Sequence, residues 1–178
     1  GTASLAEGEI KKVIEATRGA LREASWGNEE EWRNDDEWRK KAPYRYGTSP
    51  GDPDRFREDV VELAIRGRSL YTNLANDLAH DVSGGQAALA AAVRRPGRFQ
   101  IASARGALYL PAGLLYDHPL EASPRGAKGE MTICDAFLGA AAATAPLESS
   151  ACFRGDCPNY KDPMVVCPAG FWGFRHQI

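Results

Sequence analysis

Residues 165–176 read Val165-Val166-Cys167-Pro168-Ala169-Gly170-Phe171-Trp172-Gly173-Phe174-Arg175-His176. The first residues of this stretch predict a short apolar strand that begins at Met164. A tight turn is expected after Cys167, because Pro and Gly interrupt regular structure. Three large rings then follow within four residues, a pattern typical of a core-filling connection in which glycine lets the backbone pass close to the rings. As an alternative, the rings wall a ligand or partner pocket, where Arg175 and His176 meet an anionic group.

The chain before this stretch changes from helical to extended patterning near Arg98. Apolar stripes with helical spacing predict three helices, over 5–25, 53–78 and 86–94. The second helix is expected to bury Phe56, Val60, Leu63, Ala64, Gly67, Leu70, Leu74 and Leu78. Alternation and turn residues predict strands over 99–103 and 108–110, and a further helix over 132–143. The fold class is therefore α/β, with a helical N-terminal region and a Cys-rich loop.

Residues 26–55 differ from their surroundings, because Trp26, Trp32 and Trp38 lie among many charges and the segment then becomes rich in Pro and Gly. We interpret the segment as a surface excursion that aromatic anchors hold to the core. An alternative is a partner-binding arm, since Trp and Tyr are favoured at binding hot spots. Two regions follow: a helical region over 1–52 that carries this arm, and an α/β part over 53–178.

Composition limits the function classes. Of the 178 residues, 43% are hydrophobic and 26% are charged, and the formal net charge is −2. Because neither sign dominates, the sequence does not indicate a nucleic-acid binder. No apolar run approaches the ~20 residues that span a bilayer, and no export signal is visible. A cytoplasmic location, where cysteines stay reduced, is the expectation.

Two segments carry a resemblance to a known family. The first runs from Phe99 to Asp117 and ends Leu110-Pro111-Ala112-Gly113-Leu114-Leu115-Tyr116-Asp117, and the second is the 165–176 stretch. Together they resemble the early part of bacterial CHAT domains, in which a strand precedes an apolar-Pro-Trp-x-Leu-x-Tyr-Asp element. Ala112 or Gly113 stands where the family often has Trp. The resemblance covers about residues 53–178 and implies a caspase-like fold with a His–Cys catalytic dyad downstream of the segments matched here.

The residues themselves do not indicate a catalytic pair. In caspase-like sites the His precedes a Gly at a strand end, and none of His80, His118 and His176 precedes Gly. A Gly-x-Ser-x-Gly motif and a phosphate-binding Gly-rich loop are also absent from the sequence. The expected set of catalytic residues in this chain is therefore empty, and whether the chain is an enzyme is left open.

All four cysteines fall within residues 134–167: Cys134, Cys152, Cys157 and Cys167. Four thiolates in a tetrahedron are a structural zinc site, and such a site would order the Pro/Gly-rich loop. Cys167 precedes a Pro-Ala-Gly turn whose amides suit a metal-bound sulfur. Two alternatives remain: the cysteines are small buried hydrophobes, or they form two disulfides, which a cytosolic location disfavours.

The sequence leads to two functional hypotheses. The first is the non-catalytic front part of a caspase-like CHAT peptidase or effector, whose partner is the remainder of that domain. The second is a zinc-stabilised interaction module that binds a protein through residues 26–46. Neither hypothesis involves nucleic acid or a membrane.

Overall fold

The structure is a computed structural model, and it describes residues 7–27, 44–46, 52–80, 85–100, 109–121 and 130–178. The architecture is mixed α/β, mostly helical with one small parallel sheet. The elements in order are α1 (Glu7–Trp26), α3 (Pro53–His80), α4 (Gly85–Val93), η2 (Ala112–Leu114), β1 (Thr132–Ile133), α5 (Asp135–Ala142), η3 (Leu147–Ser149), β2 (Val165–Val166), η4 (Pro168–Gly170) and α6 (Trp172–Arg175). Among the described helices, none combines the length and the apolar character needed to cross a membrane.

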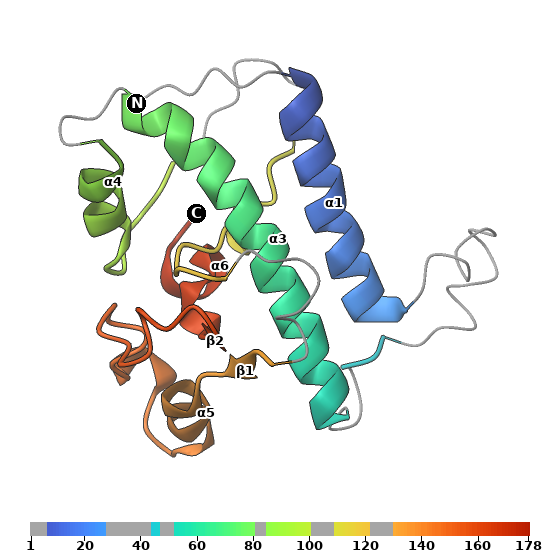
Figure 1. The fold of residues 1–178 in the computed structure, drawn as a ribbon. Coiled ribbons are helices and arrows are strands. Elements are labelled where there is room, and N and C mark those ends of the chain that lie inside the picture. The colour runs from blue at the N-terminus through green and yellow to red at the C-terminus, as the bar shows by residue number, and fades with distance from the viewer. Residues whose placement is uncertain (1–6, 28–43, 47–51, 81–84, 101–108, 122–129) are drawn as a thin grey trace.

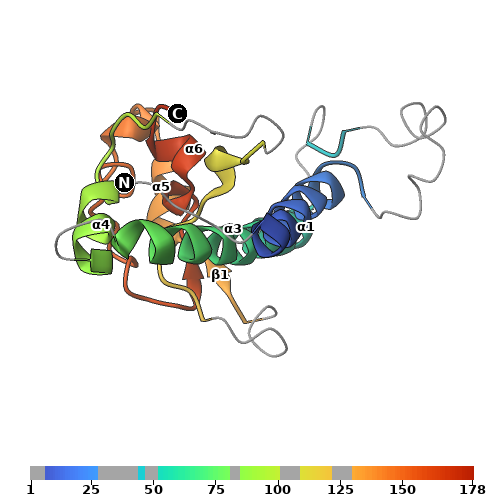
Figure 2. The same ribbon diagram turned by 90° about the horizontal axis from the view of Figure 1, so that it is seen from above.

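Helix α3 lies in the middle of the molecule. Helix α1 runs antiparallel along one side of it, and α4, the β1–β2 pair, α5 and α6 lie on the other (Figure 1). Seen from above, α4 lies beside the C-terminal end of α3 (Figure 2). The apolar stripe expected for α1 is confirmed at Ile10 and Ile14, which are buried, but Leu21 at its end is 39% exposed. The buried Thr17 hydroxyl donates to the carbonyl oxygen of Val13.

One core cluster joins α1, α3 and the C-terminal segment, and it contains Ile10, Ile14, Leu70, Tyr71, Ala75, Val93, Ala112, Leu115 and Trp172. The indole of Trp172 packs on the rings of Tyr71 and Phe99. Trp172 and Phe171 are both buried, whereas Phe174 is 54% exposed. The core-filling interpretation of the ring-rich segment is thus confirmed for two of its three rings.

The segment 112–117 crosses α3 at Gly67. Tyr116 donates its backbone N–H to the carbonyl oxygen of Gly67 at 3.2 Å. A Cβ atom at Gly67 would overlap with the carbonyl oxygen of Leu114 and press on Tyr116. Glycine is therefore required in the middle of this helix despite its low helix propensity.

Gly67→Ala is expected to destabilise the fold by ~2 kcal/mol, because the overpacking cost of ~1–3 kcal/mol exceeds the gain in helix propensity. Gly19→Ala in α1 is the matched control, since a Cβ there has no atom within 4 Å; it should stabilise by ~0.5–1 kcal/mol. Urea denaturation of both variants measures the difference. Equal stabilities would contradict the close crossing at Gly67.

Strands β1 and β2 pair in parallel, with Thr132 opposite Val165 and Ile133 opposite Val166. The backbone N–H of Cys134 donates to the carbonyl oxygen of Val166 at 2.9 Å. Parallel strands have their carboxyl ends at the same edge of the sheet. Cys134 and Cys167, which follow β1 and β2, are therefore brought together.

The strands expected over 99–103 and 108–110 do not appear where the chain is described. Residues 99–100 and 109–110 have no strand conformation, and 101–108 lie outside the described residues. Just before the first of these segments, Arg98 forms an isolated parallel bridge with Gln177. The helix predicted over 53–78 was expected to bury Phe56, but Phe56 lies in the first turn and is 40% exposed. The side chain of Leu78 lies outside the described residues. The helix expected over 132–143 begins only at Asp135, since residues 132–133 form β1.

The two ends of the Trp-containing segment are held together. Arg45 donates its backbone N–H to Ser25, and the rings of Trp26 and Tyr44 lie 5.8 Å apart. The hydroxyl of Tyr46 donates to Asp59 of α3 at 2.6 Å. Residues 28–43, with Trp32 and Trp38, lie outside the described residues, and the division into regions 1–52 and 53–178 stays a prediction.

Candidate metal centre

The four cysteines form one cluster, although Cys134 and Cys167 are 33 positions apart in the sequence. All their Sγ atoms lie within 4.8 Å of one another, and all four side chains are buried. The Sγ atoms of Cys134 and Cys157 are 3.7 Å apart. Four sulfurs at ~2.3 Å from a central zinc ion would be separated by ~3.8 Å. The cluster therefore has the size of a tetrahedral thiolate site.

A disulfide does not fit this geometry. Bonded sulfurs lie ~2.05 Å apart, and all four cysteines are free. The simpler alternative of four buried hydrophobes does account for the apolar shell of Phe137, Phe153 and Ala169. It does not explain why four thiols from two strand ends and one loop converge on a common point. The arrangement is compatible with a structural metal ion.

Local structure positions each sulfur. Cys134 precedes the first turn of α5, and Cys167 precedes η4. Cys152 and Cys157 lie in a loop that turns at Gly155, whose φ is +85°, a conformation that favours glycine. The guanidinium of Arg94 donates to the carbonyl oxygen of Gly155 at 2.7 Å and fixes this turn to the end of α4.

One of the amides that was expected to face the Cys167 sulfur bonds within its own turn. The N–H of Gly170 donates to the carbonyl oxygen of Cys167 at 2.8 Å and closes the η4 turn. A donor to a cluster sulfur comes instead from Asn159, in the turn after Cys157. The side-chain amide of Asn159 reaches Cys134 Sγ at 3.4 Å.

The thiols of Cys152, Cys157 and Cys167 have different pKa values. Hydrogen bonds, first from Cys167 and then from the Asn159 amide, lower the pKa of Cys157 to about 6. Burial raises the pKa of Cys152 to about 12, and the pKa of Cys167 is raised, first because its thiol donates to Cys157. Without a cation the thiolate form is thus favoured at Cys157 and disfavoured at Cys152 and Cys167. A divalent metal would displace the remaining protons, because metal binding to thiols releases them.

Next to the cluster lies a network of buried charged groups that sequence patterns did not reveal. The guanidinium of Arg175 donates to the carboxylate of Asp117, and also to the carbonyl oxygens of Ala169 and Val93 at 2.8 and 2.9 Å. Arg68 donates to the carbonyl oxygen of Asp117 at 2.9 Å. Burial, only partly offset by Arg175, raises the pKa of Asp117 to about 6.

The histidines belong to this network or border it. His118 is 2% exposed, and its Nε2 lies 3.3 Å from a nitrogen of Arg175. Because guanidinium only donates, Nε2 is the acceptor and the ring is neutral. Burial lowers the pKa of His118 to about 3 and that of His176 to about 4. The side chain of His80 lies outside the described residues.

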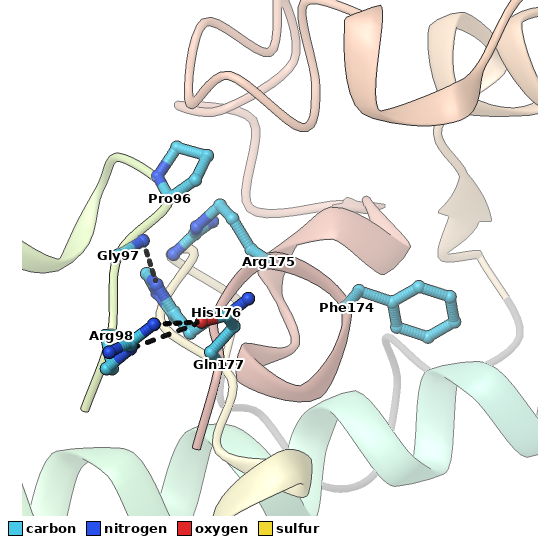
Figure 3. Close-up of a pocket in the computed structure, with 7 residues that line it drawn as sticks. All are labelled: Pro96, Gly97, Arg98, Phe174, Arg175, His176 and Gln177. Atoms are coloured by element: carbon cyan, nitrogen blue, oxygen red, sulfur yellow. Dashed lines mark hydrogen bonds between the residues drawn. The ribbon is translucent and has the colours of Figure 1, made fainter. Parts of the chain in front are cut away.

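An open pocket of about 670 Å³ lies between residues 96–98 and 174–177 (Figure 3). Arg98 donates to the side-chain oxygen of Gln177, and His176 accepts from the N–H of Gly97 at 3.1 Å. Phe174 points away from the other lining residues (Figure 3). The alternative interpretation of the ring-rich segment placed an anion beside Arg175 and His176, but the guanidinium of Arg175 is bound inward to Asp117.

Comparison with known proteins relates the chain to a protease. A protein from Vitiosangium sp. (strain GDMCC 1.1324), named as a probable protease, is 41% identical over 170 residues. The match takes in 95% of this chain and 21% of that protein, so the chain spans about one fifth of its relative's length. No protein-family model matches the chain, and no solved structure gives a significant match. The CHAT family and the caspase-like fold stay predictions.

Proposed function

We propose that this chain is the non-catalytic front part of a caspase-like CHAT cysteine peptidase or effector in a bacterial signalling or defence system. The observation that carries the proposal is the relative named as a probable protease, which matches 95% of this chain with about one fifth of its own length. In this proposal the catalytic His–Cys dyad lies elsewhere in the protease. The chain contributes structure, and its partner is the remainder of that domain.

The described side chains support a non-catalytic role. A general base acts best when its pKa lies near the working pH, whereas burial lowers the pKa of His118 to about 3 and that of His176 to about 4. A nucleophilic cysteine is a partly exposed thiolate. All four cysteines are instead buried in one cluster.

The same proposal gives the cysteines a structural task. Cys134, Cys152, Cys157 and Cys167 hold a zinc ion that ties the 146–163 loop to the ends of β1 and β2. Support comes from the sulfur spacing, the burial of all four ligands and the side-chain N–H donor of Asn159. Sulfur ligation in a closed tetrahedral set is what structural zinc prefers.

The purified chain is expected to show no peptidase activity. Cysteine-directed electrophiles should label its thiols no faster than ordinary thiols, because all four thiols, including the acidic one of Cys157, are buried. Fluorogenic peptide libraries and mass spectrometry measure both, with a known cysteine peptidase assayed in parallel. Stoichiometric labelling of one cysteine, together with peptide cleavage that its change to Ala abolishes, would contradict a non-catalytic role.

A zinc-stabilised interaction module that binds a protein through residues 26–46 is the second candidate. One observation favours it: Tyr44 is 51% exposed although it takes part in a chain of ring contacts with Trp26 and Tyr46. The native locus distinguishes the two. A reading frame that continues into a strand ending in His-Gly, and later into a strand ending at Cys, supports the peptidase. A stop at residue 178 supports the module.

A further inference from the structure

Asn159 contacts one sulfur of the cysteine cluster from the loop that carries Cys152 and Cys157. It follows Cys157 and Pro158 in the sequence. Its side-chain nitrogen Nδ2 lies 3.4 Å from Cys134 Sγ. One residue of the loop thus reaches the cysteine that follows β1.

The orientation of the Asn159 carboxamide is determined by its neighbours. Nδ2 also lies 3.0 Å from Oδ1 of Asp135. A carboxylate oxygen only accepts hydrogen bonds, so the amide nitrogen, and not the amide oxygen, faces Asp135 and Cys134. Asp135 Oδ1 is itself held by the backbone N–H of Ala136 at 2.7 Å. The carboxamide is therefore fixed with its two N–H groups directed at one carboxylate and one sulfur.

These donors suit a cluster of anionic sulfurs. A hydrogen bond to the charged form of a group favours that form, and four thiolates around a divalent ion carry excess negative charge. Residues that hydrogen-bond to metal ligands orient them and tune metal affinity. A neutral donor to one of these ligands lowers the repulsion among the thiolates without adding a competing ligand.

We propose that Asn159 is a positioning residue of the metal site, which sets how tightly the four cysteines hold their metal by donating to Cys134. This inference rests on the proposed zinc site. Asn159→Asp keeps the shape of the side chain and replaces its donor with a carboxylate that repels the thiolates. Asn159→Ala removes the side-chain donor without adding a charge.

The experiment measures zinc affinity of the full chain by competition with a chromophoric chelator. It also records the sulfur-to-cobalt charge-transfer bands after cobalt substitution. Asn159→Asp should bind zinc ~10–100-fold more weakly, the usual effect of losing such a contact, and Asn159→Ala should lie between it and the unaltered chain. Asn73→Ala and Asn73→Asp are matched controls, because Asn73 is an exposed residue of α3 that donates to Ser69; both should leave the affinity unchanged.

The outcomes separate this inference from the proposed site. If the unaltered chain binds neither zinc nor cobalt, the metal site fails and the role of Asn159 fails with it. If the unaltered chain binds metal and both Asn159 variants match the Asn73 controls, only the inference is overturned. Should Asn159→Asp not fold, Asn159→Ala decides: weaker zinc binding with intact cobalt–sulfur bands supports a positioning role, and unchanged affinity overturns it.

Discussion

Removing the metal is expected to unfold the C-terminal third of the chain. The protein as purified should carry about one zinc ion per chain, with Zn–S distances of ~2.3 Å. The loop between α5 and β2 contains only one short 3-10 helix, η3, as regular structure. Its attachment to the core therefore depends strongly on the cysteine cluster. Structural zinc contributes ~10–16 kcal/mol of apparent binding free energy in small domains, enough to decide whether such a loop is ordered.

Metal analysis and thermal melts, with and without chelator, measure this effect. Chelator previously saturated with zinc is the control, and adding zinc to the stripped protein should restore the melt. Cys152→Ser and Cys157→Ser should behave alike, because the loss of either ligand opens the same site. The contradicting result is a metal content near zero in protein whose four thiols are free and whose melt ignores chelator. Cys134 and Cys167 would then be core residues, and packing alone would hold the loop.

The helices and the cysteine cluster were predictable for physical reasons that act locally. Apolar spacing sets which face of α1 and α3 is buried, so Ile14 and Leu70 were identifiable as core. The crowding of all cysteines into residues 134–167 indicated a shared site, and the fold confirms that the four converge. The strand expected from 99 to 103 was less predictable, because alternation does not say whether a partner strand exists.

The buried network and the role of Asn159 depend on contacts between distant positions. Asp117 and Arg175 are 58 residues apart, and neither belongs to a pattern with helical or strand period. Asn159 is one polar residue in a polar loop, and only the fold shows which sulfur it contacts. Long-range pairing of single charged residues leaves no periodic signal in one sequence, so the structure was needed to find it.

Arg175 joins three segments at a buried point. Its side chain is 0% exposed. The guanidinium donates hydrogen bonds to the Asp117 carboxylate, to the carbonyl oxygen of Val93 at the end of α4, and to that of Ala169 in η4. Burying charge is costly unless the charge is paired and hydrogen-bonded. Removing one partner of a buried pair leaves the other uncompensated, which typically costs ~3–5 kcal/mol.

Arg175→Met is therefore expected to destabilise the zinc-loaded protein by ~3–5 kcal/mol, because it leaves the Asp117 carboxylate without its cation and frees two buried carbonyl oxygens. Asp117→Asn should cost less, since Arg175 keeps its bonds to Val93 and Ala169. The matched control is Arg66→Met. Arg66 pairs with Glu62 one turn away on α3 and is 46% exposed, so its loss should cost less than ~1 kcal/mol.

Urea denaturation at constant zinc concentration measures the free energy of unfolding of all three variants. Metal content is determined in parallel, so that a loss of zinc is not mistaken for a loss of the ion pair. A cost for Arg175→Met as small as that for Arg66→Met would show that the three segments are held by apolar packing and not by the guanidinium. The expected loss of stability follows the number of buried partners that each change leaves unpaired. It is therefore largest for Arg175→Met, smaller for Asp117→Asn and smallest for Arg66→Met. Burial, and not the presence of an ion pair, is what separates the first variant from the last.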